Sequence, residues 1–225
     1  MIQGVIFDLD GVLTATDGLH TRAWAETCSR WGMAFHSETA PLLRGVGRNE
    51  AARIVVSRSG KELSNNALEW FAEDKNELYC SLLSRLTPAD VLPQVPETLA
   101  AVRARGIGMA VASASKNARL ILERIGLAAA FDAIVDGTQI TKTKPDPEVF
   151  LRAADALSLP PCWCLVVEDA VSGLQAARAI GCRTAAIGSD AHGHGADCDI
   201  ERIDDILRLV DRNHQWENLT CCTSN

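Results

Sequence analysis

The stretch Val5-Ile6-Phe7-Asp8-Leu9-Asp10-Gly11 joins a short apolar run to two acidic residues and a glycine. The run Val5–Phe7 lacks polar alternation, which is typical of a strand covered on both faces of a parallel sheet. Carboxylates directly after such a strand are costly unless they are paired or bind a cation. The stretch therefore predicts a buried strand with a functional site at its carboxyl end.

Other apolar runs of the same kind predict the rest of the sheet: Met109–Ala112, Ala133–Val135, Leu165–Val167 and Thr184–Ile187. Between them lie helical stretches that stop at a glycine, a residue that adopts the left-handed cap conformation easily. These stretches are Glu97–Arg105, Asn117–Ile125 and Ser172–Ile180. The alternation of strand and helix predicts an α/β fold with a doubly wound, Rossmann-like parallel sheet.

Residues 15–87 break this alternation, because they carry helical patterns and no strand signal. Trp24, Cys28 and Trp31 follow helical spacing, as do the apolar residues of the stripe Leu68–Leu82. We expect a helical cap domain over residues 15–87, inserted into an α/β core formed by residues 1–14 and 88–211. The polar residues 212–225 are expected to form a tail without regular structure.

Composition narrows the classes of partner. The 225 residues carry a net charge of −7, and this acidic balance argues against a nucleic-acid partner. No apolar stretch reaches the roughly 18 residues of a membrane-spanning helix, and the first residues do not resemble a secretory signal. The cysteines lack zinc-site spacing, so we expect reduced thiols in a cytoplasmic protein, with no membrane partner.

Four loops follow predicted strands and contain the residue types expected at a reaction centre. They are Asp8-Leu9-Asp10-Gly11, Ser113-Ala114-Ser115-Lys116-Asn117, Lys144-Pro145-Asp146-Pro147 and Glu168-Asp169. Right-handed crossovers place the carboxyl ends of parallel strands at one edge of the sheet. We therefore expect these loops, although distant in sequence, to meet in one crevice.

The acidic residues of this crevice predict a metal site formed by Asp8, Asp10, Glu168 and Asp169. Close carboxylates raise one another's pKa unless a cation neutralises them, and hard oxygen ligands suit one Mg²⁺ ion. A calcium hand fits less well, because Leu19 occupies the position where such a loop requires glutamate.

A metal-bound carboxylate is able to attack phosphorus, so Asp8 is the predicted nucleophile and Asp10 the predicted acid and base. Lys144 and Ser113 would stabilise the transferring phosphoryl group. The plainer alternatives are solvated acids in a capped turn, a surface lysine before a proline turn, and a serine that only caps a helix.

These loops resemble those of the haloacid dehalogenase-like superfamily. Further residues resemble its β-phosphoglucomutase branch over Ile2 to about Val210: Thr14, Thr16, His20, Trp24, Gly45-Val46-x-Arg48 and Lys75-Asn76. The resemblance implies interconversion of β-D-glucose 1-phosphate and glucose 6-phosphate. It also implies an aspartyl-phosphate at Asp8 and β-glucose 1,6-bisphosphate as intermediate and activator.

The resemblance assigns further roles. The Asp10 carbonyl would join the metal ligands, and Arg48 would bind the distal phosphate. The residues that it implies for substrate binding are His20, Trp24, Gly45, Arg48, Lys75, Ala114, Ser115, Lys116 and Asn117. Sugar phosphates are the expected partners, and a monomer the expected state. Two departures from the branch are Ala15, where an aspartate is usual, and Arg44, where lysine is frequent; they concern cap closure and sugar preference.

The sequence supports the cap residues independently. Lys75 lies on the apolar stripe Leu68–Leu82, where a lysine is disfavoured unless its head meets an anion or reaches water. His20 precedes Trp24 by one helical turn, on the same inner face. The alternatives are a lysine that extends to solvent and a histidine that merely packs. For the whole chain, the rivals are a Mg²⁺-dependent sugar-phosphate phosphatase and a non-catalytic binding protein.

Overall fold

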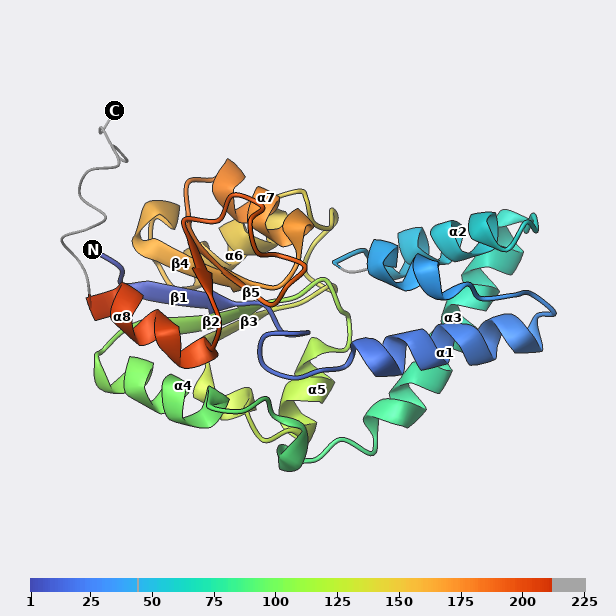
Figure 1. Ribbon diagram of the computed structural model, residues 1–225. Coiled ribbons are helices and arrows are strands. Elements are labelled where there is room, and N and C mark those ends of the chain that lie inside the picture. Colours follow the sequence, from blue (N-terminus) through green and yellow to red (C-terminus); the bar gives the residue numbers. More distant parts are fainter. Residues whose placement is uncertain (44, 212–225) are drawn as a thin grey trace.

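The computed structural model describes residues 1–43 and 45–211. Its centre is one parallel sheet in the order β3-β2-β1-β4-β5-β6 (Figure 1). The strands are β1 (Gly4–Phe7), β2 (Gly108–Ala112), β3 (Ala133–Val135), β4 (Cys164–Glu168), β5 (Arg183–Ile187) and β6 (Cys198–Ile200). The strand order reverses direction around β1, so the doubly wound α/β prediction is confirmed.

Helices cover both faces of this sheet (Figure 1). Val5 and Phe7 pack on one face with α4 (Val95–Ala104), α5 (Ala118–Arg124) and α8 (Ile206–Asp211). Ile6 packs on the other face with α6 (Glu148–Ala156) and α7 (Val171–Ala179). Residues of one strand therefore alternate between two apolar layers, which explains why the run contains no polar residue.

A helical insert follows β1 and extends away from the sheet (Figure 1). It contains α1 (Asp17–Arg30), η1 (Ser37–Leu43), α2 (Arg48–Arg58) and α3 (Asn65–Leu83), where η denotes a 3₁₀ helix. The insert has its own apolar cluster, which contains Trp24, Cys28 and Phe71 and is separate from the two apolar layers on the sheet. The inserted helical cap is thus confirmed, whereas its proposed boundaries at residues 15 and 87 stay a prediction.

Two linkers connect the insert to the sheet, and they run side by side. Thr14 Oγ1 donates to the Asp90 carbonyl at 2.8 Å, and Leu92 N donates to the Leu13 carbonyl at 2.9 Å. A short 3₁₀ turn, η2 (Pro88–Asp90), is capped by Thr87 where the chain leaves the insert. The side chain of Thr14, next to the exposed Ala15, thus supplies a linker hydrogen bond.

The structure also adds elements and corrects one expectation. β6, α6 and α8 were not predicted, along with the short turns η3 (Ala128–Ala130), η4 (Pro161–Trp163) and η5 (Ile203–Asp205). The prediction of reduced thiols is wrong for Cys162, which is disulfide-bonded, whereas Cys28, Cys80 and Cys164 carry free thiols. None of the described helices combines the length and apolarity needed to cross a membrane. Arg44 and the tail 212–225 lie outside the described residues.

Candidate active site

One pocket lies between the carboxyl edge of the sheet and the insert, and every predicted site residue lines it. The sheet loops contribute Asp8, Asp10, Ser113, Ala114, Ser115, Lys116, Asn117, Lys144, Glu168 and Asp169. The insert contributes His20, Trp24, Gly45, Arg48 and Lys75. The expected convergence of the four loops is therefore observed.

Lys144 holds two carboxylates together at the bottom of this pocket. Its Nζ lies 2.5 Å from Asp8 Oδ1 and 2.5 Å from Glu168 Oε1, and it also donates to the Ala112 carbonyl at 3.3 Å. The side chains of Lys144 and Glu168 are each 1% exposed, so water screens these ion pairs weakly. Lys144 is therefore an internal counter-ion and not a surface lysine.

The carboxyl groups of Asp8 and Asp169 are more basic than ordinary ones. Burial raises the pKa of Asp8 to about 7 despite the opposing charge of Lys144. Burial, followed by the charges of Asp8 and Glu168, raises the pKa of Asp169 to about 8. Burial alone would lower the pKa of Lys144, but the carboxylates of Asp8 and Glu168 raise it above its usual value. The single positive charge of Lys144 is thus not enough to stabilise all of the neighbouring carboxylates in their charged form.

The donor set fits a divalent cation. Asp8, Glu168 and Asp169 each offer an oxygen, and these atoms all lie within 4.8 Å of one another. Such a hard, all-oxygen set suits Mg²⁺. The side chain of Asp10 is not part of this group of three carboxylates, so its predicted part in the metal site stays a prediction.

Two glycines make room for this cluster. Gly11 has a φ of +80°, and a Cβ at this position would collide with the carboxylate of Asp169. A Cβ on Gly173 would likewise collide with the carboxylate of Glu168. These close approaches explain why the turn after Asp10 and the first turn of α7 require residues without a side chain.

Asp10 differs from these carboxylates in its hydrogen bonding. Its Oδ1 is buried and has no hydrogen-bond partner among the described residues. Burial, with the charge of Asp8 second, raises its pKa well above the ordinary value. A buried carboxyl that lacks a partner and holds its proton more firmly is suited to protonate a bound oxygen.

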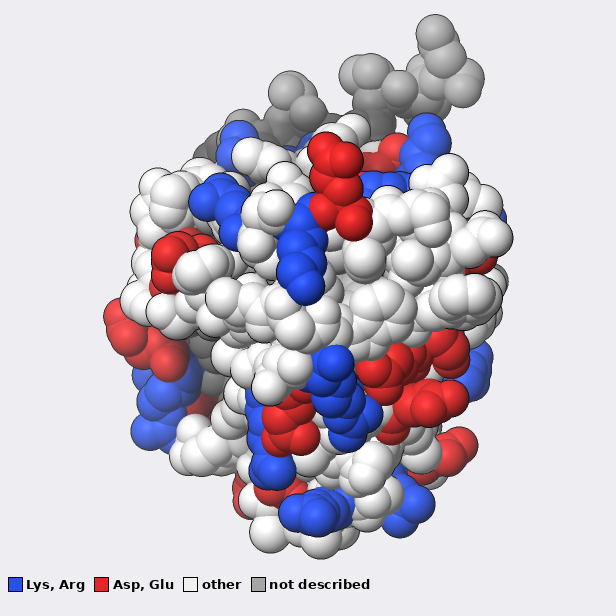
Figure 2. Space-filling model, turned by 90° about the vertical axis from the view of Figure 1, so that its right-hand side faces the viewer, with Lys and Arg blue, Asp and Glu red and all other residues white. Residues whose placement is uncertain are grey.

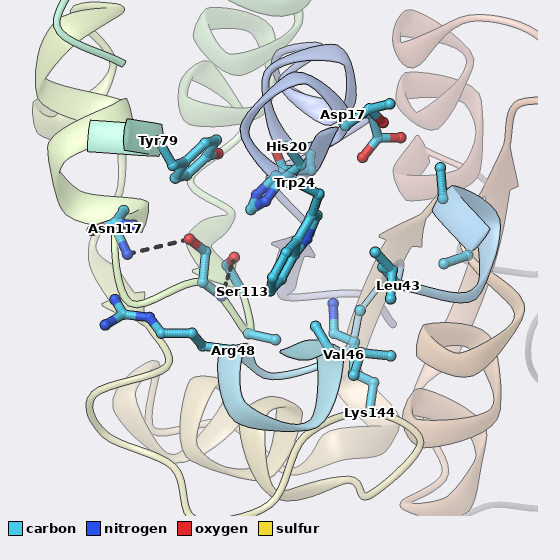
Figure 3. Close-up of a pocket in the computed structure, with 18 of the residues that line it drawn as sticks. Asp17, His20, Trp24, Leu43, Val46, Arg48, Tyr79, Ser113, Asn117 and Lys144 are labelled. Atoms are coloured by element: carbon cyan, nitrogen blue, oxygen red, sulfur yellow. Dashed lines mark hydrogen bonds between the residues drawn. The ribbon is translucent and has the colours of Figure 1, made fainter. Parts of the chain in front are cut away.

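The loop after β2 is shaped by its own serines. Ser113 Oγ accepts from the backbone N–H of Ser115 at 3.1 Å, and Ser115 Oγ accepts from that of Asn117 at 3.2 Å. Ser113 is buried, and its backbone N–H is bonded to the Val135 carbonyl. These turns fix the loop so that Ser113 and Asn117 face the pocket, as Figure 3 shows.

On the insert side, Lys75 is enclosed by aromatic rings. Its Nζ lies 2.8 Å from His20 Nδ1, 4.9 Å from the Trp24 ring centre and 4.3 Å from that of Tyr79. Burial, with Arg48 adding to it, lowers the pKa of Lys75 to about 7. Burial and the charge of Lys75 lower the pKa of His20 well below its usual value. The ammonium group of Lys75 therefore does not extend to solvent, and His20 forms a polar contact with it in addition to packing.

Arg48, at the start of α2, links the insert to the sheet loops. Its Nη1 donates to Glu73 Oε2 at 2.9 Å, and its Nη2 donates to Asn76 Oδ1 at 2.8 Å. Asn76 Oδ1 also accepts from Asn117 Nδ2 at 3.0 Å. This chain of bonds crosses the gap between α3 and the loop after β2, which places the guanidinium at the rim of the pocket (Figure 3).

The turn before α2 also touches the sheet loops. A Cβ on Gly45 would approach Ser172 Oγ to 2.9 Å and the Lys144 side chain to 3.7 Å. A Cβ on Gly47 would approach Thr143 Cγ2 to 2.8 Å. The insert therefore closes onto the loop that carries Lys144 through a contact that glycines make possible.

Several lining residues were not predicted: Asp17, Thr21, Ala40, Pro41, Leu43, Val46, Ala51, Asn76, Tyr79 and Ala170. Among them, Leu43 and Val46 lie beside Trp24 and form an apolar side of the pocket (Figure 3). Tyr79 follows Lys75 by four residues, so helical spacing alone was a usable signal for it. Val46 and Asn76 belong to motifs named from the sequence, whereas small and apolar residues such as Ala40, Leu43 and Ala51 carry no signal of their own.

The family model for haloacid dehalogenase-like hydrolases matches residues 2–181. The chain belongs to this family. Over 219 residues it is 34% identical to the β-phosphoglucomutase of Bacillus subtilis, covering 96% of both proteins. The crystal structure of a β-phosphoglucomutase from Clostridium difficile superposes with a TM-score of 0.89 at 29% identity, covering 96% of this chain and 98% of that one.

Other members of the haloacid dehalogenase-like family are phosphatases by name. The fructose-1-phosphate phosphatase YqaB of Escherichia coli is 32% identical over 178 residues, which cover 79% of this chain and 92% of that protein. Mutase and phosphatase relatives both act on phosphorylated sugars. The family membership therefore identifies an enzyme of phosphoryl transfer or phosphate-ester hydrolysis, and the choice between the two depends on the pocket.

The raised carboxylate pKa values predict how added Mg²⁺ acts at different pH. An acid with a folded pKa above its ordinary 3.8 destabilises the fold as pH rises, here until about 7 for Asp8 and about 8 for Asp169. A bound cation removes this penalty. We expect Mg²⁺, compared with a chelator, to raise the thermal unfolding midpoint more at about pH 8 than at about pH 6.

The control for this measurement is Asp169→Asn, which is expected to lose most of the Mg²⁺-dependent increase. An increase of equal size at both pH values, or one that Asp169→Asn retains, would contradict a cation site formed by these carboxylates.

Proposed function

We propose that the protein is a β-phosphoglucomutase, which interconverts β-D-glucose 1-phosphate and glucose 6-phosphate through β-glucose 1,6-bisphosphate. The observation that carries the proposal is the presence of Arg48 and Lys75 in the same pocket as Asp8. A mutase must hold a second phosphate away from the reacting one, and cations on the insert suit that task. The similarity to the Bacillus subtilis mutase over nearly the full length of both proteins supports the same activity.

In the proposed first step, a carboxylate oxygen of Asp8 attacks the phosphorus of the bisphosphate. The new Asp8–phosphorus bond forms as the phosphorus–oxygen bond to the sugar breaks, and Asp10 gives its proton to the departing sugar oxygen. In the return step, a hydroxyl of a newly bound β-glucose 1-phosphate gives a proton to Asp10 and attacks the aspartyl-phosphate, and the bisphosphate that forms turns around before the next transfer. The bond to Asp8 breaks, and both carboxyl groups return to their starting states.

Lys144 remains beside Asp8 throughout and offsets negative charge on the transferring group, to which Ser113 and Ala114 lie close in the pocket. Asp8, Glu168 and Asp169, with the Asp10 carbonyl, would hold Mg²⁺, which would supply the further positive charge that a phosphoryl group requires. Closure of the insert would exclude water from the aspartyl-phosphate. A cytoplasmic location and a monomeric state stay predictions.

The second candidate is a sugar-phosphate phosphatase, favoured by the similarity to the Escherichia coli fructose-1-phosphate phosphatase. The phosphatase reaction differs from the mutase reaction only in the acceptor of the phosphoryl group, which is water instead of a sugar hydroxyl. The charges seen from the insert end of the molecule do not decide the matter, since acidic and basic side chains are interspersed there (Figure 2).

Product analysis separates the two. The enzyme is supplied with Mg²⁺, β-glucose 1-phosphate and a trace of glucose 1,6-bisphosphate, and both glucose 6-phosphate and inorganic phosphate are measured. A mutase yields mainly glucose 6-phosphate. Predominant release of phosphate would establish the phosphatase instead.

Arg48→Ala is expected to reduce kcat/KM for isomerisation by about 10- to 100-fold, the typical effect of losing hydrogen bonds to a charged group. Hydrolysis of acetyl phosphate, which has no distal phosphate, should change by less than about threefold. The matched control is Arg53→Ala on the same helix, because Arg53 is exposed and its ion pair with Glu50 lies on the surface. Equal loss of both reactions in Arg48→Ala would assign Arg48 a structural role.

A further inference from the structure

Tyr79 has more specific contacts than a residue that only fills space. It is the largest of the fully buried side chains in the described residues, and it lines the pocket. Its ring stacks on that of His20 with centroids 3.9 Å apart and an angle of 27°. The same ring faces Lys75 Nζ at 4.3 Å, and its hydroxyl donates to Thr16 Oγ1 at 3.3 Å.

These contacts join two helices and a linker. Lys75 and Tyr79 lie four residues apart on α3 and therefore share one face. Thr16 and His20 lie four residues apart where α1 begins, and the His20 N–H donates to the Thr16 carbonyl at 3.0 Å. Thr16 is fully buried and directly precedes α1, at the point where the chain enters the insert. The four residues form a closed group, in which each side chain contacts one from the other helix.

We propose that Tyr79 is a positioning residue that fixes the His20–Lys75 pair relative to the linker at Thr16. The role of that pair toward a sugar phosphate rests on the proposed function, whereas the positioning itself does not. A buried ammonium group needs electron-rich neighbours, and the face of the ring supplies one to Lys75. Stacking on the imidazole leaves His20 one ring orientation, with Nδ1 facing Lys75.

The group also connects the pocket side chains of the insert to the linker that joins the insert to the sheet. Figure 3 shows Tyr79 beside His20, with Trp24 next to them, all reaching into the pocket from the insert. Because the hydroxyl of Tyr79 is bonded to Thr16, a change in the linker would move the ring and with it both polar groups. Tyr79 thus ties the arrangement of the pocket to the position of the insert.

The kinetic test compares Tyr79→Leu, Tyr79→Phe and the control Phe71→Leu. Phe71 is a buried aromatic residue of the same helix, but its ring packs on Trp24 and Trp31. Tyr79→Leu should reduce kcat/KM for the sugar phosphate by about 30-fold or more, with acetyl phosphate hydrolysis within about threefold. Tyr79→Phe retains the ring and loses one hydrogen bond, so a loss of up to about tenfold is expected. If Tyr79→Leu and Phe71→Leu lower both reactions in the same proportion, Tyr79 is merely part of the packing.

A second readout does not depend on the identity of the substrate. Nitrogen NMR of ¹⁵N-histidine-labelled protein, assigned with His20→Gln, reports the tautomer of His20. We expect one tautomer in the wild type and in Phe71→Leu, and averaging between tautomers in Tyr79→Leu. An unchanged His20 spectrum in Tyr79→Leu would overturn the proposal, even if the sugar-phosphate activity itself were absent and the proposed function had failed.

Discussion

Replacing Asp8 by asparagine is expected to lower turnover of sugar phosphates by about four orders of magnitude or more, because the nucleophile is then lost. Asparagine has nearly the same shape, but its amide oxygen carries no negative charge with which to form the phosphorus bond. The substitution also removes the ion pair with Lys144 while leaving the pairing of Lys144 with Glu168 possible. The fold should therefore persist, and calorimetry should still detect binding of glucose 6-phosphate.

The control for this variant is Asp146→Asn, in the loop that carries Lys144. Asp146 pairs with the exposed Lys142 at 3.4 Å and does not line the pocket. Its turnover is expected to remain within about threefold of the wild type. Substantial turnover by Asp8→Asn would remove Asp8 from the reaction and leave the carboxylate cluster without its proposed purpose.

The second large effect is expected for Lys144→Met. This change removes the cation that contacts both Asp8 and Glu168, and it leaves two buried carboxylates close together. Breaking a buried ion pair from one side typically costs about 3 to 5 kcal/mol in the free energy of unfolding. Turnover should fall by about 10³-fold, since charge on the transferring group is no longer offset.

The stability of Lys144→Met is expected to depend strongly on metal. Mg²⁺ should restore more of its unfolding free energy than it adds to the wild type, because a cation in the cluster replaces part of the missing charge. Lys142→Met is the matched control, since the side chain of Lys142 is 71% exposed and its ion pair is on the surface. It should alter stability by less than about 0.5 kcal/mol. If the two substitutions changed the free energy of unfolding equally, the buried ion pairs of Lys144 would contribute no more to stability than a surface ion pair.

The sheet and the polar residues around it could be predicted from the sequence, because their signals are local. Apolar runs without alternation identified β1 to β5, and polar residues directly after them identified the pocket loops. β6 was missed because its three residues include the exposed Asp199, so it lacks the pattern of a buried strand. α6 was missed because two prolines shortly before it resemble a loop, although Pro147 serves as its N-cap.

What the sequence could not supply is distance and pairing. Lys144 was predicted to act near Asp8, but its equal contact with Glu168 depends on the register of three strands. That the Asp10 side chain is absent from the group of three close carboxylates likewise depends on side-chain positions that the sequence does not specify. Tyr79 was overlooked although its spacing from Lys75 placed it on the same helix face, because a buried tyrosine in a helix usually packs; its contacts with His20 and Thr16 distinguish it from such a residue.

The central claim is that Asp8 becomes covalently phosphorylated during turnover. It is tested most directly by quenching the enzyme in acid while it reacts with Mg²⁺ and a phosphoryl donor, then locating the phosphoryl group by peptide mass spectrometry. We predict one phosphoryl group, on the peptide that contains Asp8, and none on that peptide in Asp8→Asn. Turnover that continues with no label on this peptide, or with the label on another residue, would contradict the account.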